Sequence, residues 1–154
     1  MNLELSTLFK GVKEEYITLL QPLFERFSCP AGTMVIEQGE AADFLYLVEN
    51  GMVEIFYKPY DNEVITITHV EAGGLFGWSA LIGSTKYTSS GVAINELSAL
   101  RIRGLDLRKL CQESPEAGKV ILDRLAGAVS SRWKDAHEQV RSILESGLNY
   151  QRID

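Results

Sequence analysis

The first part of the chain carries apolar residues at intervals of three to four, the spacing of an amphipathic helix. Leu5, Leu8 and Phe9 share one face of a short first helix. A second run continues the spacing, and its members are Tyr16, Leu19, Leu20, Leu23 and Phe24. Pro22 predicts a kink or a restart within that run, because proline lacks the amide that a helix interior needs. The Cys29–Gly32 segment then predicts a turn.

Between Thr33 and Arg103 the pattern changes to short strands separated by turn residues. The expected strands are Met34–Ile36, Phe44–Val48, Val53–Lys58, Val64–Val70, Leu75–Phe76, Gly91–Ile94 and Leu97–Ile102. Glu49–Gly51 predicts a tight hairpin, because Asn and Gly accept positive φ. The last two strands are expected to form a pair. Short strands with glycine turns favour a sandwich or barrel over an α/β sheet.

The last third of the chain is helical in pattern. Leu105–Gln112 predicts a short helix, and Ser114 is a suitable N-cap for a second helix that has Pro115 at its first position. We expect this second helix to run to about Glu145, where Ser146-Gly147 ends it.

The expected long helix carries one continuous apolar stripe with steps of three or four residues. The stripe consists of Leu122, Leu125, Val129, Trp133, Ala136, Val140 and Ile143. At 1.5 Å per residue such a helix extends roughly 45 Å, which is longer than a small β-structure covers. The simplest partner for the uncovered stripe is the same helix of a second copy, so we predict a homodimer with these residues at its interface.

The composition fits one globular domain, with 154 residues of which 45% are hydrophobic and 23% charged. Within this single domain, residues 1–113 would hold the N-terminal helices, the strands and the short helix. Residues 114–147 would form the long helix, and residues 148–154 a tail.

The charge and the apolar runs exclude several classes of partner. The net charge is −6, and no run of Lys and Arg in the sequence would form a basic patch, so the phosphates of nucleic acid would be repelled. No stretch approaches the roughly 20 apolar residues of a membrane span, and no signal peptide is visible. We therefore expect a soluble, cytoplasmic protein without membrane contact, in which Cys29 and Cys111 are reduced, buried thiols.

Three glycine-containing blocks lie at characteristic offsets within the strand region: Pro30–Glu40, Phe44–Val53 and Gly74–Leu81. Together they resemble the cyclic-nucleotide-binding domain family of catabolite-activator-type regulators, kinase regulatory subunits and gated channels. The resemblance runs from about Leu8 to Ile143. It implies a mainly β fold with flanking helices, namely a jelly-roll-like double-stranded β-helix followed by a long dimerisation helix.

The resemblance also implies a phosphate-binding cradle in the third block. In the family, a Phe-Gly-Glu-x-Ala-Leu motif opens a helical turn whose amides face the cyclic phosphate. The glutamate binds the ribose hydroxyl, and about nine residues later an arginine pairs with the phosphate and precedes a small hydroxyl residue. Here Trp78 stands at the glutamate position and Tyr87 at the arginine position. The candidate ligand-binding residues are Phe76, Gly77, Trp78, Ser79, Ala80, Leu81, Lys86, Tyr87, Thr88, Ser89 and, from the long helix, His137.

The two replacements change the expected chemistry of the cradle. An arginine pairs with phosphate through two charge-assisted hydrogen bonds, whereas Lys86 offers only a point charge. We therefore expect cAMP binding to be weak or absent. Trp78 either stacks on a ligand ring or fills the space of the nucleotide. Tyr87 is expected to pack or to make a hydroxyl contact.

These residues lead to a hypothesis of a regulatory domain that senses a small anionic or nucleotide-like ligand. The ligand would lie between the cradle, Thr88 and Ser89, and the long helix, and binding would shift the helices of the dimer. The family's regulators carry a helix-turn-helix domain after this helix, whereas only Gly147–Asp154 follow it here, so we expect no specific DNA binding and action through a partner protein. No nucleophile–base motif, P-loop or metal-ligand cluster suggests an enzyme.

Two other functions stay open at this point. The pocket could be degenerate, filled by Trp78 and Tyr87, which would leave a dimerisation and interaction module. A haem-based sensor would need His69 or His137 as a ligand, but neither histidine has an accompanying motif, so haem is not expected.

Overall fold

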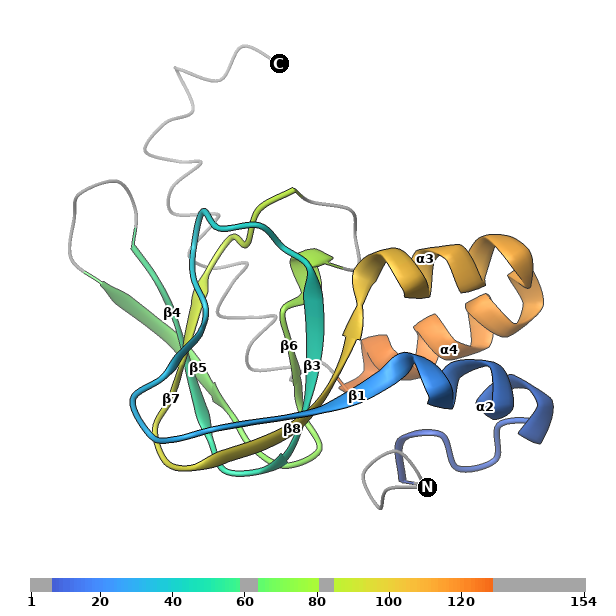
Figure 1. Ribbon diagram of the computed structural model, residues 1–154, viewed down its shortest axis with the longest axis horizontal. Helices are drawn as coiled ribbons and strands as arrows, with labels where there is room; N and C mark the ends of the chain where they lie inside the picture. The colour runs from blue at the N-terminus through green and yellow to red at the C-terminus, as the bar shows by residue number, and fades with distance from the viewer. Residues whose placement is uncertain (1–6, 59–63, 81–84, 129–154) are drawn as a thin grey trace, which may run out of the picture.

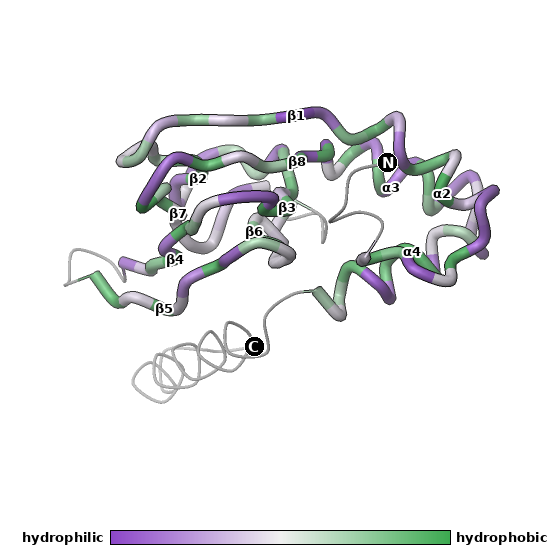
Figure 2. The backbone as a smooth tube through the Cα atoms, turned by 90° about the horizontal axis from the view of Figure 1, so that it is seen from below, coloured by the Kyte–Doolittle hydropathy of each residue, from purple (hydrophilic) through white to green (hydrophobic). Residues whose placement is uncertain are grey.

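The computed structural model describes residues 7–58, 64–80 and 85–128. Its helices are α2 (Glu14–Leu20), α3 (Gly104–Glu113) and α4 (Pro115–Ala128), with 3-10 turns η1 (Gln21–Leu23) and η2 (Trp78–Ala80). Its strands are β1 (Phe24–Cys29), β2 (Met34–Ile36), β3 (Phe44–Asn50), β4 (Val53–Tyr57), β5 (Ile65–Val70), β6 (Leu75–Phe76), β7 (Ser90–Ala93) and β8 (Leu97–Arg103). The helices gather at one end of the strands in two perpendicular views (Figures 1 and 2). This arrangement confirms a mainly β fold with flanking helices.

The strands form two antiparallel sheets of four, in the orders β1-β8-β3-β6 and β2-β7-β4-β5. The predicted hairpin at Glu49–Gly51 is wrong. The turn exists, with Gly51 at φ +102°, but it carries the chain from β3 in one sheet to β4 in the other. The last two strands likewise belong to different sheets and do not pair. The local turn signal was correct in both cases, whereas the choice of pairing partner depends on strands far away along the chain.

Strand β1 corrects the prediction of a helix through Phe24. The helix α2 ends at Leu20, and Pro22 occupies the 3-10 turn that follows. The chain then extends along β8, with Phe24 opposite Ile102 and Cys29 opposite Leu97. Tertiary pairing therefore overrides the helical spacing of Leu23 and Phe24.

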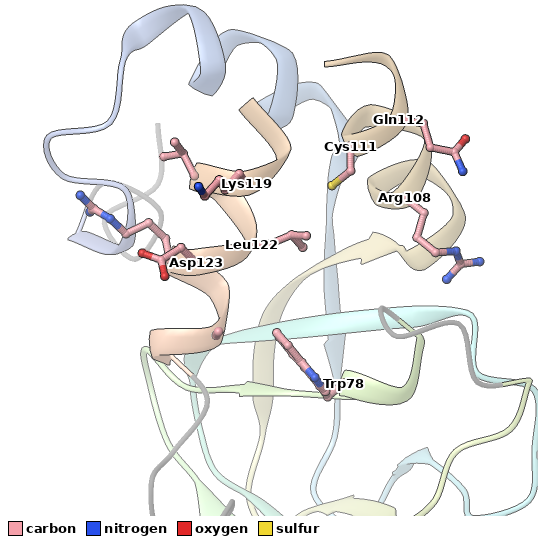
Figure 3. Close-up of a pocket in the computed structure, with 10 residues that line it drawn as sticks. Trp78, Arg108, Cys111, Gln112, Lys119, Leu122 and Asp123 are labelled. Atoms are coloured by element: carbon pink, nitrogen blue, oxygen red, sulfur yellow. The ribbon is translucent and has the colours of Figure 1, made fainter. Parts of the chain in front are cut away.

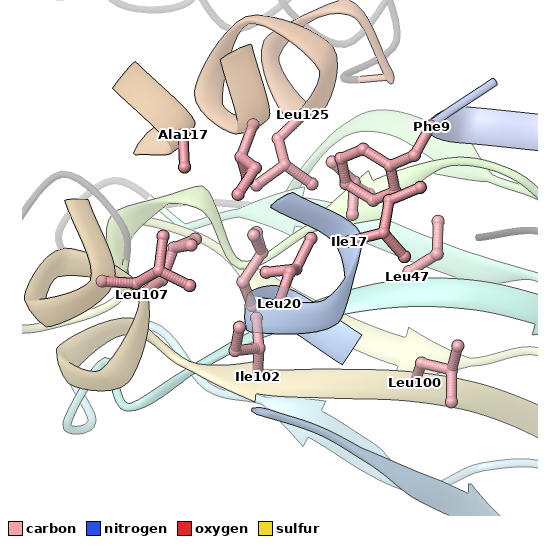
Figure 4. Close-up of a cluster of buried hydrophobic side chains, with 13 residues drawn as sticks. Phe9, Ile17, Leu20, Leu47, Leu100, Ile102, Leu107, Ala117 and Leu125 are labelled. Carbon is pink, nitrogen blue, oxygen red and sulfur yellow. The ribbon is translucent and has the colours of Figure 1, made fainter. Parts of the chain in front are cut away.

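The sheet that contains β3 and β8 separates two hydrophobic cores. On its outer face it packs against the helices through a helix-side core of Phe9, Ile17, Leu20, Leu45, Leu47, Leu75, Leu100, Ile102, Leu107, Leu110, Ala117, Ile121 and Leu125 (Figure 4). Its inner face joins the second sheet through an inter-sheet core of Ile36, Tyr46, Val48, Val53, Ile55, Ile67, Val70, Phe76, Tyr87, Ala93, Leu97 and Ala99. Successive residues of β3 enter the two cores alternately, which explains its uninterrupted apolar run.

The C-terminal helices begin as expected. Helix α3 contains the predicted Leu105–Gln112 helix, and α4 begins at Pro115, where the amide of Gly118 donates to the carbonyl of Ser114 at 2.8 Å. The predicted continuation to Glu145 lies outside the described residues. So do the interface candidates Val129, Trp133, Ala136, Val140 and Ile143.

Two members of the predicted dimer stripe are described. Leu125 is 0% exposed within the helix-side core, so its side chain is covered by its own chain and offers no surface to a second copy. Leu122 is half-buried and packs at the margin of the same core. The assignment of Leu125 to a dimer interface is therefore corrected.

Candidate functional site

The backbone of the cradle depends on Gly77, which joins β6 to η2. Gly77 has φ +86°, and a Cβ at this position would lie 2.7 Å from the carbonyl oxygen of Phe44. Both the left-handed conformation and the close approach require glycine. The amide of Ala80 then donates to the carbonyl of Gly77 at 3.1 Å and closes the turn.

The residues around Gly77 are held in place by packing and by two polar contacts. The Phe76 ring stacks on the Tyr46 ring with centroids 4.8 Å apart. Ala80 is fully buried, and its carbonyl accepts a hydrogen bond from the Arg108 guanidinium on α3. The buried hydroxyl of Ser79 lies 3.4 Å from the hydroxyl of Thr88, so the structure brings these two candidates together. Leu81 lies outside the described residues.

Tyr87, at the family's arginine position, is fixed to the backbone of β3. Its hydroxyl donates to the carbonyl of Phe44 at 2.6 Å and accepts from the amide of Phe44 at 3.0 Å. Its own backbone is paired with the β2–β3 connection, since the Tyr87 amide donates to Glu40 and the Gly39 amide donates to Tyr87. Burial raises the pKa of Tyr87 to about 12, so the phenol stays protonated. The expected hydroxyl contact is thus present, but with the protein backbone.

Phe44 consequently connects the two halves of the cradle. Its carbonyl oxygen accepts the Tyr87 hydroxyl and is also the atom that excludes a side chain at Gly77. We therefore expect a substitution at Tyr87 to affect the turn at Gly77 through the Phe44 carbonyl group.

Replacing Tyr87 by phenylalanine is expected to lower the free energy of unfolding by about 1–3 kcal/mol, because the buried Phe44 carbonyl loses its donor. The pKa of Tyr87 rises from 10.0 to about 12 on folding. The contribution of the protonated Tyr87 to the free energy of unfolding is therefore fully present below pH 10 and is lost as the pH rises toward 12. The variant should lose this alkaline decline. Urea unfolding across this range measures both effects.

Tyr57→Phe is a suitable control, because Tyr57 is half-buried and packs at the margin of the inter-sheet core. We expect it to change the free energy of unfolding by less than about 0.5 kcal/mol. If Tyr57→Phe and Tyr87→Phe destabilised the protein equally, the contact with Phe44 would have no special role.

The remaining candidates after Tyr87 differ in exposure. Lys86 is exposed and lies opposite Ala41 in an isolated β-bridge. Thr88 is exposed, whereas Ser89 is 6% exposed. Thr88 and Ser89 thus offer one accessible and one buried hydroxyl directly after the arginine position.

Trp78, at the family's glutamate position, is half-buried against the helix-side core. It lines a groove together with residues of α3 and α4, including Arg108 and Leu122 (Figure 3). The residue at the ribose-acceptor position therefore packs at the margin of the core that the sheet and the helices share. Whether it also stacks on a ligand stays a prediction.

The haem and metal alternatives gain no geometric support. His69 is exposed on β5, opposite Glu54 of β4, and His137 lies outside the described residues. Within the described ranges, no three His, Cys, Asp or Glu side chains gather as metal ligands. Cys29 and Cys111 are free thiols, and both are half-buried where buried thiols were expected. None of the helices that the structure describes is long and apolar enough to cross a bilayer.

Comparison with known sequences decides the family. The profile described as "Cyclic nucleotide-binding domain" matches residues 26–114, more than half of the chain. The chain belongs to the cyclic nucleotide-binding domain family. It is 28% identical over 131 residues to the cyclic AMP receptor protein of Thermus thermophilus, covering 85% of this chain and 59% of that protein.

Two further relatives show the breadth of the cyclic nucleotide-binding domain family. The chain is 32% identical over 89 residues to the cAMP-dependent protein kinase regulatory subunit of Blastocladiella emersonii, covering 58% of this chain and 22% of that one. A solved cyclic nucleotide-binding-like protein from Brucella abortus matches with a TM-score of 0.58 at 30% identity, covering 71% of this chain and 95% of that one. The chain therefore spans less than two thirds of both sequence relatives.

Two contacts of the candidate cradle were not predicted. The Tyr87 hydroxyl bonds the backbone of Phe44, 43 residues away along the chain, and the Arg108 guanidinium bonds the carbonyl of Ala80, 28 residues away. No spacing in the sequence indicates such contacts, because the backbone partner leaves no residue-type signal.

Proposed function

We propose that this domain is a regulatory sensor for a small anionic or nucleotide-like ligand, with a cradle that does not bind cAMP in the family's usual way. One observation carries the proposal. The glycine-dependent cradle backbone is retained at Gly77, while the Tyr87 hydroxyl at the arginine position is engaged by Phe44. A ligand here would meet backbone amides and hydroxyls instead of a guanidinium and a carboxylate.

The hydroxyls support a polar ligand beside the cradle. Those of Ser79 and Thr88 converge at 3.4 Å, and Ser89 lies one residue further along. Hydroxyls both donate and accept hydrogen bonds, so they suit a less charged or differently substituted molecule than a cyclic phosphate.

We further propose that the domain works as a homodimer in the cytoplasm and signals through its long helix to a partner protein. Helix α4 packs on α3, and α3 holds Ala80 of the cradle through Arg108. A ligand that moves the cradle would thus bias the position of α4.

Calorimetric titration of the full chain with cAMP, cGMP and AMP tests the sensor function. We expect cAMP to bind more weakly than about 100 μM, because a charge-assisted bidentate pair is missing. A ligand that does bind should raise the melting temperature, and Thr88→Val should remove that shift while Thr85→Val, also exposed, leaves it. Tight cAMP binding by the unchanged chain would contradict the proposed chemistry.

A second candidate function is a dimerisation module without a ligand. It is favoured by the hydrogen bonds between Tyr87 and Phe44 and by the packing of Trp78 at the margin of the helix-side core, because both replaced positions then have partners within the chain. Absence of a thermal shift with every nucleotide and small anion, in a protein that remains dimeric by light scattering, would favour this module over the sensor.

A further inference from the structure

A groove of about 1150 Å³ lies between α3 and α4, on the helix side of the cradle. We call it the α3–α4 groove, and its lining is Trp78, Arg108, Cys111, Gln112, Lys119, Val120, Leu122, Asp123, Arg124 and Ala126 (Figure 3). We propose that the α3–α4 groove is the docking site for an acidic amphipathic helix of a partner protein.

The floor of the groove is apolar and aromatic. Trp78 lies on the sheet side, and Leu122 reaches from α4 toward α3 (Figure 3). Both side chains are only half-buried, so each keeps apolar surface for a partner. Such half-exposed aromatic and aliphatic side chains in a concave site are the usual anchors of a protein interface.

The charges of the lining favour an acidic occupant. The lining contains three cations, Arg108, Lys119 and Arg124, and one acid, Asp123. This sign is opposite to the net charge of −6 that the chain carries. An acidic segment would therefore be repelled by most of the protein surface and attracted to the groove. This contrast would both strengthen binding and direct the segment to the groove.

The cations are also held in defined positions. The Arg124 guanidinium donates to the carbonyls of Leu8 at 3.3 Å and Lys10 at 2.7 Å, and Arg108 donates to Ala80. A guanidinium has five N–H donors, so these contacts leave donors for a carboxylate. Lys119 is exposed and adds an accessible positive charge.

The shape favours a helix from a different protein over a second copy. Two packed helices present an elongated groove, and an apolar stripe at i, i+3, i+4 and i+7 fits such a groove. A symmetric dimer through this surface would place two positively charged grooves face to face, which is unfavourable. The occupant would touch Trp78 of the cradle and both helices, so its affinity would respond to the state of the cradle.

Peptide binding tests the charge and the place. The probes are two labelled helical peptides of about 18 residues with leucines at i, i+3, i+4 and i+7, one flanked by glutamates and the other by lysines at the same positions. By fluorescence anisotropy with the full chain, we expect the glutamate peptide to bind at least about tenfold more tightly. Lys119→Glu should weaken it about fivefold. Lys109→Glu, exposed on α3 but outside the lining, should change it less than about twofold.

The reactivity of Cys111 gives a second measurement of peptide binding, because this thiol lines the groove and is half-buried. In a Cys29→Ser chain, saturating glutamate peptide should slow the reaction of Cys111 with a disulfide reagent about fivefold, and the lysine peptide should not.

Four results would overturn the proposal: equal binding of the two peptides, no binding of either, protection of Cys111 by anionic phospholipid vesicles but not by the peptide, or dissociation of a dimer by Lys119→Glu. The third result would assign the groove to a lipid surface and the fourth to a second copy. None of them bears on ligand binding at Gly77, which the titrations with nucleotides measure separately.

Discussion

A chain that carries both Trp78→Glu and Tyr87→Arg is expected to bind cAMP about 100-fold more tightly than the parent chain. The retained cradle already has its turn at Gly77, with φ +86°. The substitutions add a carboxylate at the ribose position and a guanidinium at the phosphate position. Charge-assisted hydrogen bonds contribute about 1.5–3 kcal/mol each, and part of this gain is offset by the lost contact between Tyr87 and Phe44.

Calorimetric titration below the melting temperature of both proteins measures this gain. A Trp78→Glu, Tyr87→Lys chain is the matched control, and it should gain clearly less, because an ammonium group cannot pair with the phosphate in the bidentate geometry. Equal cAMP affinity in the parent and in the arginine chain would mean that these two positions do not determine ligand choice. In that case ligand choice would have to depend on the surroundings of Ser79 and Thr88.

The parts of the fold that the sequence predicted are those encoded by local backbone requirements. Gly77 marks the cradle because only glycine accepts its φ and its distance to Phe44. The break of the helix at Pro22 and the Ser114-Pro115 helix start are similarly local. These signals concern a residue and its immediate neighbours, so they hold whichever distant segments pack against them.

The parts that the sequence did not predict depend on partners distant along the chain. β1 is a strand because β8 pairs with it, with Glu25 also bonded to Arg101 at 2.7 Å. The turn at Gly51 was predicted correctly, but not the crossing between sheets. Periodicity describes one element at a time and carries no information on which strand will be its neighbour.

The same limitation applies to the site. Trp78 and Tyr87 were identified as departures from the family motif, yet their surroundings were not predictable. The Tyr87 hydroxyl is hydrogen-bonded to the backbone of Phe44, and Trp78 packs at the margin of the helix-side core. Both replaced positions are thus connected to the rest of the chain, and Arg108 of α3 separately holds Ala80 of the same turn.

The junction between the cradle and α3 is the point at which a single methyl group should have the largest effect on stability. Gly104 begins α3, and a Cβ there would overlap the carbonyl oxygen of Ala80 and lie 2.7 Å from the carbonyl carbon. On the opposite side, the Gly104 amide donates to the carbonyl of Asp43 at 2.9 Å. Neither backbone neighbour can withdraw without disturbing the cradle or the start of β3.

Gly104→Ala is therefore expected to lower the free energy of unfolding by about 3 kcal/mol and the melting temperature by about 10 °C. Gly127→Ala is the matched control on α4, since a Cβ there meets nothing within 4 Å. It should change the free energy of unfolding by less than about 0.5 kcal/mol, because the added methyl group meets no neighbouring atom. Urea and thermal unfolding measure both variants. A Gly104→Ala chain as stable as the parent would show that α3 shifts freely relative to Ala80. Coupling through α3 could then not explain how a ligand in the cradle changes the position of α4.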